Sequence, residues 1–341
     1  MKRFIYMLLV VALLVSLIVY YNQTKGSADL VTIPLEEVIG EEQIVEKQVS
    51  YFAPLTGLPV EEEANKRIIG VMINNLKPAR PQSGLDKADM VYEVYAEGMI
   101  TRFIAFYQSQ QPEVIGPVRS TRPYYIEIIN GFDGVIVHCG ASFTAYDILR
   151  SNSLPYLDEI TNSGSTFWRA SFRQAPHNVY TSYNKIVASM ESKDYRETGY
   201  IPSFIFLDDS KENEGLPATS INIAYNTDYH PSYEYNIEDK LYYRYIDGVA
   251  HTDLETNQQL TAKNILVVKT THKVLDSAGR LEVNVYGPGE GYLFQNGKVK
   301  EVTWERKDGV IRAYIGGVEQ GLYPGQTWVM VVDNLTPFSY Q

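Results

Sequence analysis

The chain has 341 residues, of which 45% are hydrophobic, and a formal net charge of -11 from 41 acidic and 30 basic side chains. This acidic balance excludes sequence-independent nucleic-acid binding, because such binding needs a basic surface. The single cysteine, Cys139, excludes an internal disulfide framework, so a hydrophobic core must hold the fold together.

The N-terminus begins with Lys2 and Arg3, followed by an uncharged apolar run over residues 4–21. A run of about 18 apolar residues can just span a bilayer, and basic flanks stay on the cytoplasmic side. We therefore predict a membrane anchor or signal segment over residues 1–21, which places the rest of the chain on the extracytoplasmic face. Small residues around Ala28 leave open whether the anchor is cleaved and the protein released. Residues 22–50 are polar and acidic and are predicted to form a tether.

The next part, residues 51–205, is predicted to be a mixed α/β domain. Short apolar, β-branched and aromatic runs predict strands over residues 68–73, 90–94, 102–107 and 134–137. Helical spacing of apolar residues predicts helices over residues 124–130 and 142–151.

After an acidic, glycine-containing stretch over residues 208–215, aromatic and β-branched residues alternate with polar ones. Strands are predicted over residues 233–235, 241–245, 265–268, 281–285 and 310–314. Four dipeptides are typical of hairpin turns: Asp247-Gly248, Asn296-Gly297, Asp308-Gly309 and Gly316-Gly317. Residues 215–335 should therefore form a mostly antiparallel β domain, which makes the whole chain an α+β protein.

Polar groups crowd between the strand-like runs of residues 74–122, which makes this stretch the best candidate site. Arginine can clamp a carboxylate or phosphate in a bidentate manner. The predicted ligand-binding residues are Arg80, Ser83, Arg102, Arg119, Ser120, Arg122 and His138. An internal ion-pair network that fixes the loops explains the same arginines.

Two carboxylates, Glu93 and Glu97, are four residues apart in the sequence. In a continuous strand, alternation would place both on the same face. Paired carboxylates can hydrolyse glycosides, so both are catalytic candidates, with His138 or His177 as base. A solvated strand face or structural histidines explain these residues as well. Ser182 and Lys185 match a Ser-x-x-Lys motif, which we attribute to chance. No cofactor and no metal site are predicted.

A series of motifs runs through the candidate site and into the second domain. They are residues 79–85, 88–93, 97–103, 115–122, 138–142, 262–267 and 325–328. With these motifs, residues 52–333 resemble the YerB-like family of bacterial envelope lipoproteins, which carry a two-part domain of unknown function (DUF3048). The resemblance implies an envelope-anchored, surface-exposed protein of Gram-positive type and implies no activity. Members of the family typically carry a lipid-modified cysteine after the signal segment. Its absence here favours a protein anchor or a released form.

Three functional hypotheses follow. The first is a membrane-tethered envelope protein that binds an anionic or glycan ligand, such as peptidoglycan fragments or precursors. The second is an envelope hydrolase or transglycosylase that uses the paired carboxylates. The third is a scaffold for other envelope proteins, because the 27 tyrosines suit interfaces as well as glycan stacking. The expected partners are thus cell-wall glycan or envelope proteins, the membrane through the N-terminal segment, and no nucleic acid.

Overall fold

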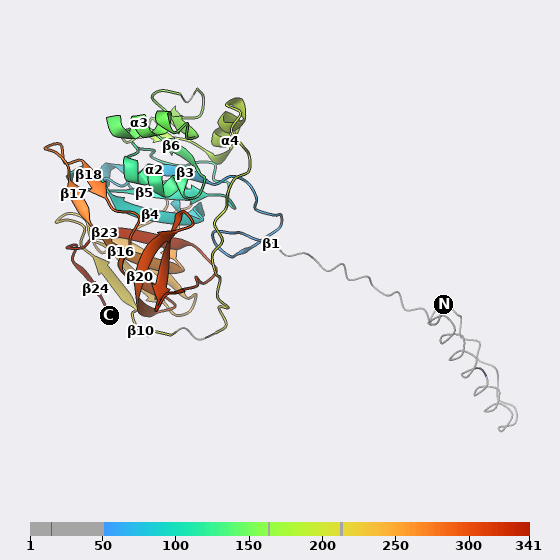
Figure 1. Cartoon of the computed structure of the whole chain (residues 1–341), viewed down its shortest axis with the longest axis vertical. Helices are drawn as coiled ribbons and strands as arrows, with labels where there is room; N and C mark the ends of the chain where they lie inside the picture. The colour runs from blue at the N-terminus through green and yellow to red at the C-terminus, as the bar shows by residue number, and fades with distance from the viewer. Residues whose placement is uncertain (1–14, 16–50, 163, 212–213) are drawn as a thin grey trace, which may run out of the picture. The chain divides into compact units, whose positions relative to one another are not determined.

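The computed structural model of the chain describes residues 15, 51–162, 164–211 and 214–341 (Figure 1). The predicted anchor and tether, residues 1–21 and 22–50, lie outside the described residues apart from Val15. In the described part of the chain, no helix is long and apolar enough to cross a bilayer. The residues described from Tyr51 to Gln341 form one compact unit.

A large sheet crosses this unit from end to end, and its strands come from both halves of the sequence. Its central members pair in the order β16, β23, β4, β5, β3, β6, β7. The pairings β16–β23, β23–β4, β3–β6 and β6–β7 are parallel, whereas β4–β5 and β5–β3 are antiparallel. The strands of the sheet are β22 (Val318–Glu319), β21 (Val310–Ile315), β20 (Lys298–Lys307), β19 (Gly289–Gln295), β16 (Asn264–Thr270), β23 (Thr327–Asp333), β4 (Met90–Tyr95), β5 (Thr101–Tyr107), β3 (Ile69–Asn74), β6 (Val135–His138), β7 (Tyr156–Asp158) and β10 (Leu216–Pro217), which pairs with β20.

A second, antiparallel sheet is built only from the C-terminal half. Its strands are β14 (Val249–Ala250), β13 (Leu241–Ile246), β12 (Pro231–Asn236), β11 (Ser220–Ile223) and β24 (Phe338–Tyr340), with β15 (Thr261–Ala262) beside β13. Three two-stranded pairs complete the set: β1 (Tyr51–Phe52) with β2 (Pro59–Val60), β8 (Trp168–Arg169) with β9 (Val179–Tyr180), and β17 (His272–Val274) with β18 (Leu281–Val283).

Two hydrophobic clusters cover the opposite faces of the large sheet. On one face, α2 (Pro123–Asn130) and α3 (Phe143–Ser151) pack on alternate residues of β3, β4 and β5. On the other face, the second sheet and α4 (Tyr183–Ser192) pack on the intervening residues of the same strands. Both faces of β3, β4 and β5 are therefore buried, which explains their nearly continuous apolar sequences. In Figure 1 the helices lie in the upper half of the unit and β16, β20 and β23 in the lower half.

The α+β class and the strand-rich C-terminal half are confirmed. All four predicted hairpin dipeptides lie in turns with positive φ at both residues, for example Asn296 at 47° and Gly297 at 72°. The predicted boundary between residues 205 and 215 divides the sequence, but in space β16 and β23 continue the sheet that contains β4. The sequence did not predict α4. Ser182, part of the Ser-x-x-Lys match, is its N-cap and accepts a hydrogen bond from the Lys185 amide at 3.3 Å.

Candidate functional site

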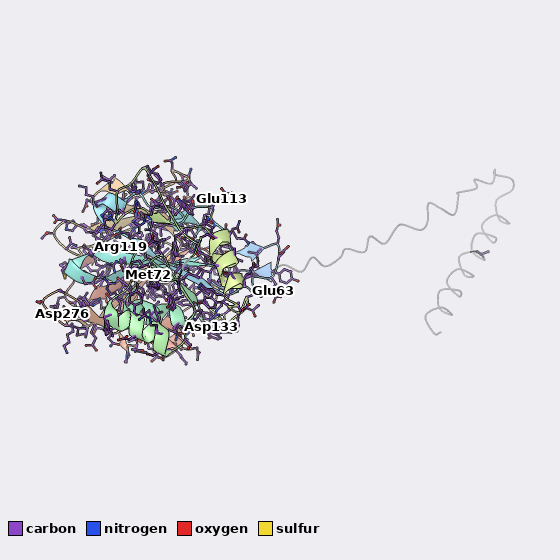
Figure 2. All side chains as sticks on the ribbon, turned by 90° about the horizontal axis from the view of Figure 1, so that it is seen from above. Glu63, Met72, Glu113, Arg119, Asp133 and Asp276 are labelled. Atoms are coloured by element: carbon purple, nitrogen blue, oxygen red, sulfur yellow. The ribbon has the colours of Figure 1, made fainter. Side chains whose placement is uncertain are left out.

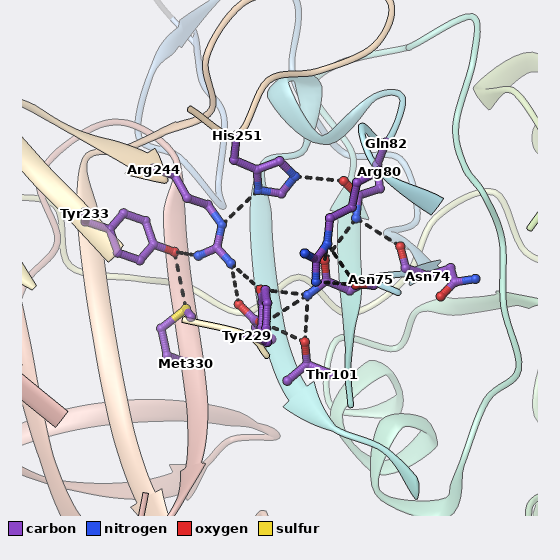
Figure 3. A network of polar contacts seen from close by, with 11 residues as sticks. Asn74, Asn75, Arg80, Gln82, Thr101, Tyr229, Tyr233, Arg244, His251 and Met330 are labelled. Carbon is purple, nitrogen blue, oxygen red and sulfur yellow. Dashed lines mark hydrogen bonds and ion pairs between the residues drawn. The ribbon is translucent and has the colours of Figure 1, made fainter. Parts of the chain in front are cut away.

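A buried ion pair between Glu93 and Arg244 joins β4 to β13. Carboxylate Oε2 and guanidinium Nη2 lie 2.7 Å apart, and neither side chain is exposed. The other carboxylate oxygen, Oε1, accepts hydrogen bonds from Tyr229, Thr101 and Asn75 at 2.6, 2.7 and 3.2 Å. Figure 3 shows Asn75, Thr101, Tyr229 and Arg244 converging from different segments. A buried charge is tolerated when it is paired and fully hydrogen-bonded, and Glu93 meets both conditions.

Aromatic rings surround the guanidinium of Arg244. Its carbon lies 4.5 Å from the ring centre of Trp328 and 5.0 Å from that of Tyr233. Nη1 donates to the Tyr233 hydroxyl, and Nε donates to His251 Nδ1 at 3.1 Å. Burial alone would lower the pKa of Arg244, but its tyrosine neighbours and Glu93 raise it above the ordinary value. The guanidinium therefore stays charged in the core.

The hydrogen bonds continue from His251 to the segment that precedes β4. Because His251 Nδ1 accepts from Arg244, the neutral ring carries its proton on Nε2, which donates to Gln82 Oε1 at 2.8 Å. Burial and the charges of Arg244 and Arg80 keep the pKa of His251 well below its usual value. Gln82 in turn donates to the Asn74 carbonyl and the Asn75 side chain at 3.0 and 3.1 Å. The network thus fixes the backbone around residues 74–82.

A pocket of about 550 Å³ lies directly over this network. Its lining comes from three segments, within residues 75–80, 98–101 and 226–229. Asn75, Thr101 and Tyr229 line the pocket and also donate to Glu93, so the network forms its floor. Arg80 lies in the wall, where its guanidinium covers the Tyr229 ring at 4.5 Å and donates to the Asn75 carbonyl at 2.7 Å.

The remaining predicted arginines lie beside the ends of β3 and β5 and the start of α2. We call Arg102, Arg119, Ser120 and Arg122 the arginine edge. Arg102 is opposite Asn74 in the sheet register, and its Nη1 donates to the Ser120 carbonyl at 3.0 Å. The backbone amide of Arg119 donates a hydrogen bond to the Met72 carbonyl at 2.8 Å, which fixes Arg119 beside β3. Both residues are labelled in Figure 2.

Glu97 compensates part of the charge of the arginine edge. It forms a bidentate pair with Arg122, whose Nη2 lies 2.9 Å from Oε2, and it lies 3.6 Å from Arg102. Burial would raise the pKa of Glu97, but hydrogen bonding and charge from Arg122 outweigh it and lower the pKa. Arg102 and Arg122 therefore take part in an internal ion-pair network with Glu97, as the alternative to ligand binding describes.

Glu93 and Glu97 do not share a strand face, although alternation predicted it. β4 ends at Tyr95, and Glu97 begins a 3₁₀ turn (Glu97–Met99) in which Gly98 has a φ of 68°. The turn carries Glu97 to the arginine edge on the α2 side of the sheet, whereas Glu93 points to the second sheet. The predicted shared face of Glu93 and Glu97 is wrong because the strand ends at Tyr95, before Glu97.

His138 and Cys139 lie beneath the arginine edge, at the end of β6. The His138 ring is fully buried, with Nδ1 2.9 Å from the Gly140 carbonyl and 3.5 Å from Asp158 Oδ1. Burial lowers the pKa of His138, and Asp158 offsets this only in part. Burial also raises the pKa of the Cys139 thiol to about 12, with a further contribution from Glu159. A thiol with that pKa is not a nucleophile at neutral pH.

The structure thus brings Arg102, Arg119, Ser120 and Arg122 together and places Arg80 separately in the pocket wall. Ser83 belongs to neither group, because its buried hydroxyl donates to Glu255 at 2.8 Å. His177, predicted as a candidate base, contacts the end of β3 from the loop between β8 and β9, with Nδ1 2.8 Å from Asn74 Nδ2.

Sequence reasoning missed most of the residues that build the pocket and its floor, among them Arg244 and Tyr229. The sequence of β13 carried no signal for Arg244, because the alternate face with Leu241, Tyr243 and Tyr245 is the one that carries only hydrophobic side chains. In the structure Tyr242, Arg244 and Ile246 are the buried positions, and a buried charge requires a counter-charge. Tyr229 lies in a loop and carried no signal either.

Comparisons with known proteins match most of the described unit. Residues 55–196 match the family described as protein of unknown function (DUF3048), N-terminal domain, and residues 221–329 match its C-terminal domain. The chain is 40% identical over 290 residues to "Putative lipoprotein YerB" of Bacillus subtilis (strain 168), which covers 83% of this chain and 86% of that protein. The crystal structure of the YerB protein from Bacillus subtilis matches with a TM-score of 0.78 and 38% identity, over 84% of this chain and 99% of that one.

Proposed function

The chain belongs to the DUF3048 family, and from that premise we propose that it is an extracytoplasmic, membrane-tethered cell-envelope protein that binds an anionic or glycan ligand. Peptidoglycan fragments or precursors are the ligands that suit this location. The relative named "Putative lipoprotein YerB" supports an envelope location for this chain as well. The apolar run over residues 4–21 supports the tether.

The observation that carries the proposal is the pocket with Arg80 in its wall. Its volume of about 550 Å³ falls within the range of small-ligand sites, roughly 300–1,000 Å³. Arg80 donates to Asn75 and stacks on Tyr229, and within the described residues it forms no ion pair. A guanidinium that is held in place but not neutralised is suited to bind a carboxylate or phosphate.

The other groups in the lining suit a hydroxyl-rich ligand. Asn226 and Thr227 add an amide and a hydroxyl to the lining, which carries two cations, Lys77 and Arg80, against one carboxylate, Asp228. Asn226 also donates to the Met99 carbonyl at 2.7 Å, which ties two walls of the pocket together. A saccharide that bears an acidic group combines the chemistry that these groups recognise.

The hydrolase alternative receives less support from the geometry. Glu93 is fully buried, and both of its oxygens already accept hydrogen bonds, so a substrate oxygen does not reach it. A general acid at neutral pH needs a raised pKa, whereas that of Glu97 is lowered. The scaffold alternative rests on tyrosines that are free to form an interface, but in the second sheet Tyr233 and Tyr242 point into the core.

The test is sedimentation of the purified full chain with purified peptidoglycan, followed by analysis of the supernatant for released muropeptides. We expect the protein in the pellet and no released products. Arg80→Gln should reduce retention about tenfold or more, because a charge-assisted hydrogen bond is lost. Arg150→Gln is the matched control, since Arg150 is exposed on α3 and its guanidinium lies over the Tyr146 ring.

Each outcome decides between the hypotheses. Released muropeptides would replace the binding proposal by the hydrolase alternative. Equal retention of Arg80→Gln and Arg150→Gln would show that the pocket is not the site. A melting temperature of Arg80→Gln close to that of the wild type is required, because Arg80 also holds the Asn75 backbone.

A further inference from the structure

Arg119 is fixed by its backbone, yet its side chain is uncommitted. Its carbonyl accepts from the Cys139 amide at 3.0 Å and its amide donates to Met72, so the residue is held between β3 and β6. Its side chain makes no hydrogen bond or ion pair with the residues that the structure describes, and Nε is buried without an acceptor. A buried donor without a partner is costly, so an acceptor from a ligand would be stabilising at this position.

His177 adds a second donor near Arg119, because it contacts Asn74, two residues along β3 from the Met72 carbonyl that holds the Arg119 amide. The Asn74 side chain is oriented by its Oδ1, which accepts from the Leu76 amide at 3.1 Å, so its Nδ2 must donate to His177 Nδ1. The neutral ring therefore carries its proton on Nε2. Burial, together with the charges of Arg119 and Arg173, lowers the pKa of His177, which keeps the ring neutral at pH 7.

The charges of this region do not balance. The arginine edge contains three arginines, but Glu97 pairs with only two of them, Arg122 and Arg102. Arg173, the other cation beside His177, is held by the Pro78 and Pro81 carbonyls rather than by a carboxylate of the described residues. Within the described part of the chain, Arg119 is therefore the cation of the edge that lacks an anion.

We propose that Arg119 and His177 form a second anion-binding site, separate from the pocket over Arg80, that takes a phosphate or carboxylate group of a ligand. The guanidinium supplies the charge and parallel donors, and His177 Nε2 supplies a third donor. Asn74 acts as a positioning residue, because it sets the tautomer of His177. The site lies where β3 and β6, parallel neighbours, end, which is where open α/β sheets commonly bind ligands.

The test is a titration of the purified full chain with inorganic phosphate and, separately, with acetate, at constant ionic strength. NMR follows the chemical shifts of the histidine ring resonances. The chain has five histidines, and a His177→Gln variant identifies the resonance of His177. We expect a saturable shift of that resonance with phosphate, acetate or both. Arg119→Gln should weaken the binding about tenfold or more, whereas Arg150→Gln should not.

The result has three outcomes. A saturable shift that depends on Arg119 supports the site, and the stronger probe identifies the preferred oxyanion. A shift of equal affinity in Arg119→Gln overturns the proposal, as does the absence of a saturable shift in the wild type. A loss of folding would not explain weaker anion binding by Arg119→Gln. The Arg119 side chain forms no hydrogen bond or ion pair with the described residues, so the melting temperature of this variant should match that of the wild type.

Discussion

Replacing Glu93 by glutamine removes one charge of the buried pair and keeps the size of the side chain. Glu93 accepts hydrogen bonds from four residues, and Arg244 has no exposed surface, so the variant leaves an unpaired guanidinium in the core. Breaking a buried pair from one side costs about 3–5 kcal/mol, which is roughly a fifth or more of the stability of a typical protein. With a slope of about 6 kcal/mol per molar guanidinium chloride, the unfolding midpoint should fall by roughly 0.5–0.8 M.

The assay is guanidinium denaturation followed by tryptophan fluorescence, which is sensitive here because Arg244 stacks on Trp328. Glu234→Gln is the matched control, because Glu234 is exposed on β12 and such substitutions usually change stability by about 0.5 kcal/mol or less. If Glu93→Gln shifts the unfolding midpoint no more than Glu234→Gln does, the ion pair does not stabilise the buried Arg244 guanidinium. Its stacking on the aromatic rings would then be sufficient. The account of the pocket floor would then be wrong.

Three further predictions concern other parts of the unit. Iodoacetamide should leave Cys139 unmodified in the native protein and label it in guanidinium, since burial raises the thiol pKa to about 12; labelling at equal rates would contradict the described burial. Burial and a neighbouring carboxylate raise the pKa of Asp253 to about 6, so the folded state holds a proton that the unfolded state releases. The protonated Asp253 therefore contributes to the free energy of unfolding at low pH. This contribution, up to about 3 kcal/mol, is lost as the pH rises from about 4 to 6. The difference in free energy of unfolding between wild type and Asp253→Asn should follow that pH dependence, and a flat difference would refute it. Finally, Gly131→Ala would place a Cβ 1.8 Å from the Gly309 carbonyl oxygen. The free energy of unfolding, measured by chemical denaturation, should therefore fall by about 1–3 kcal/mol or more.

Local structure was predictable from the sequence because its causes are local. The hairpin at Asn296 and Gly297 depends on two residues that tolerate positive φ, and both are visible in the sequence. The order of the large sheet was not predictable in the same way. β4 lies parallel to β23 with Met90 opposite Thr327, and no turn between them sets that register. The two parts of the sequence therefore look like separate domains, although they share a sheet.

The same distinction explains which charges of the candidate site could be assigned. Glu97 lies 25 residues from Arg122, within one crowded stretch, whereas Glu93 lies 151 residues from Arg244. Neither member of the distant pair was recognisable as buried from its own strand, because a solvated face explained Glu93 and Arg244 lies on the less hydrophobic face of β13 in the sequence. In the fold both side chains are buried, and two buried charges must pair with each other or with a ligand. Once such pairs are removed, the arginines that remain are those available to a ligand, and in the crowded stretch these are Arg80 and Arg119.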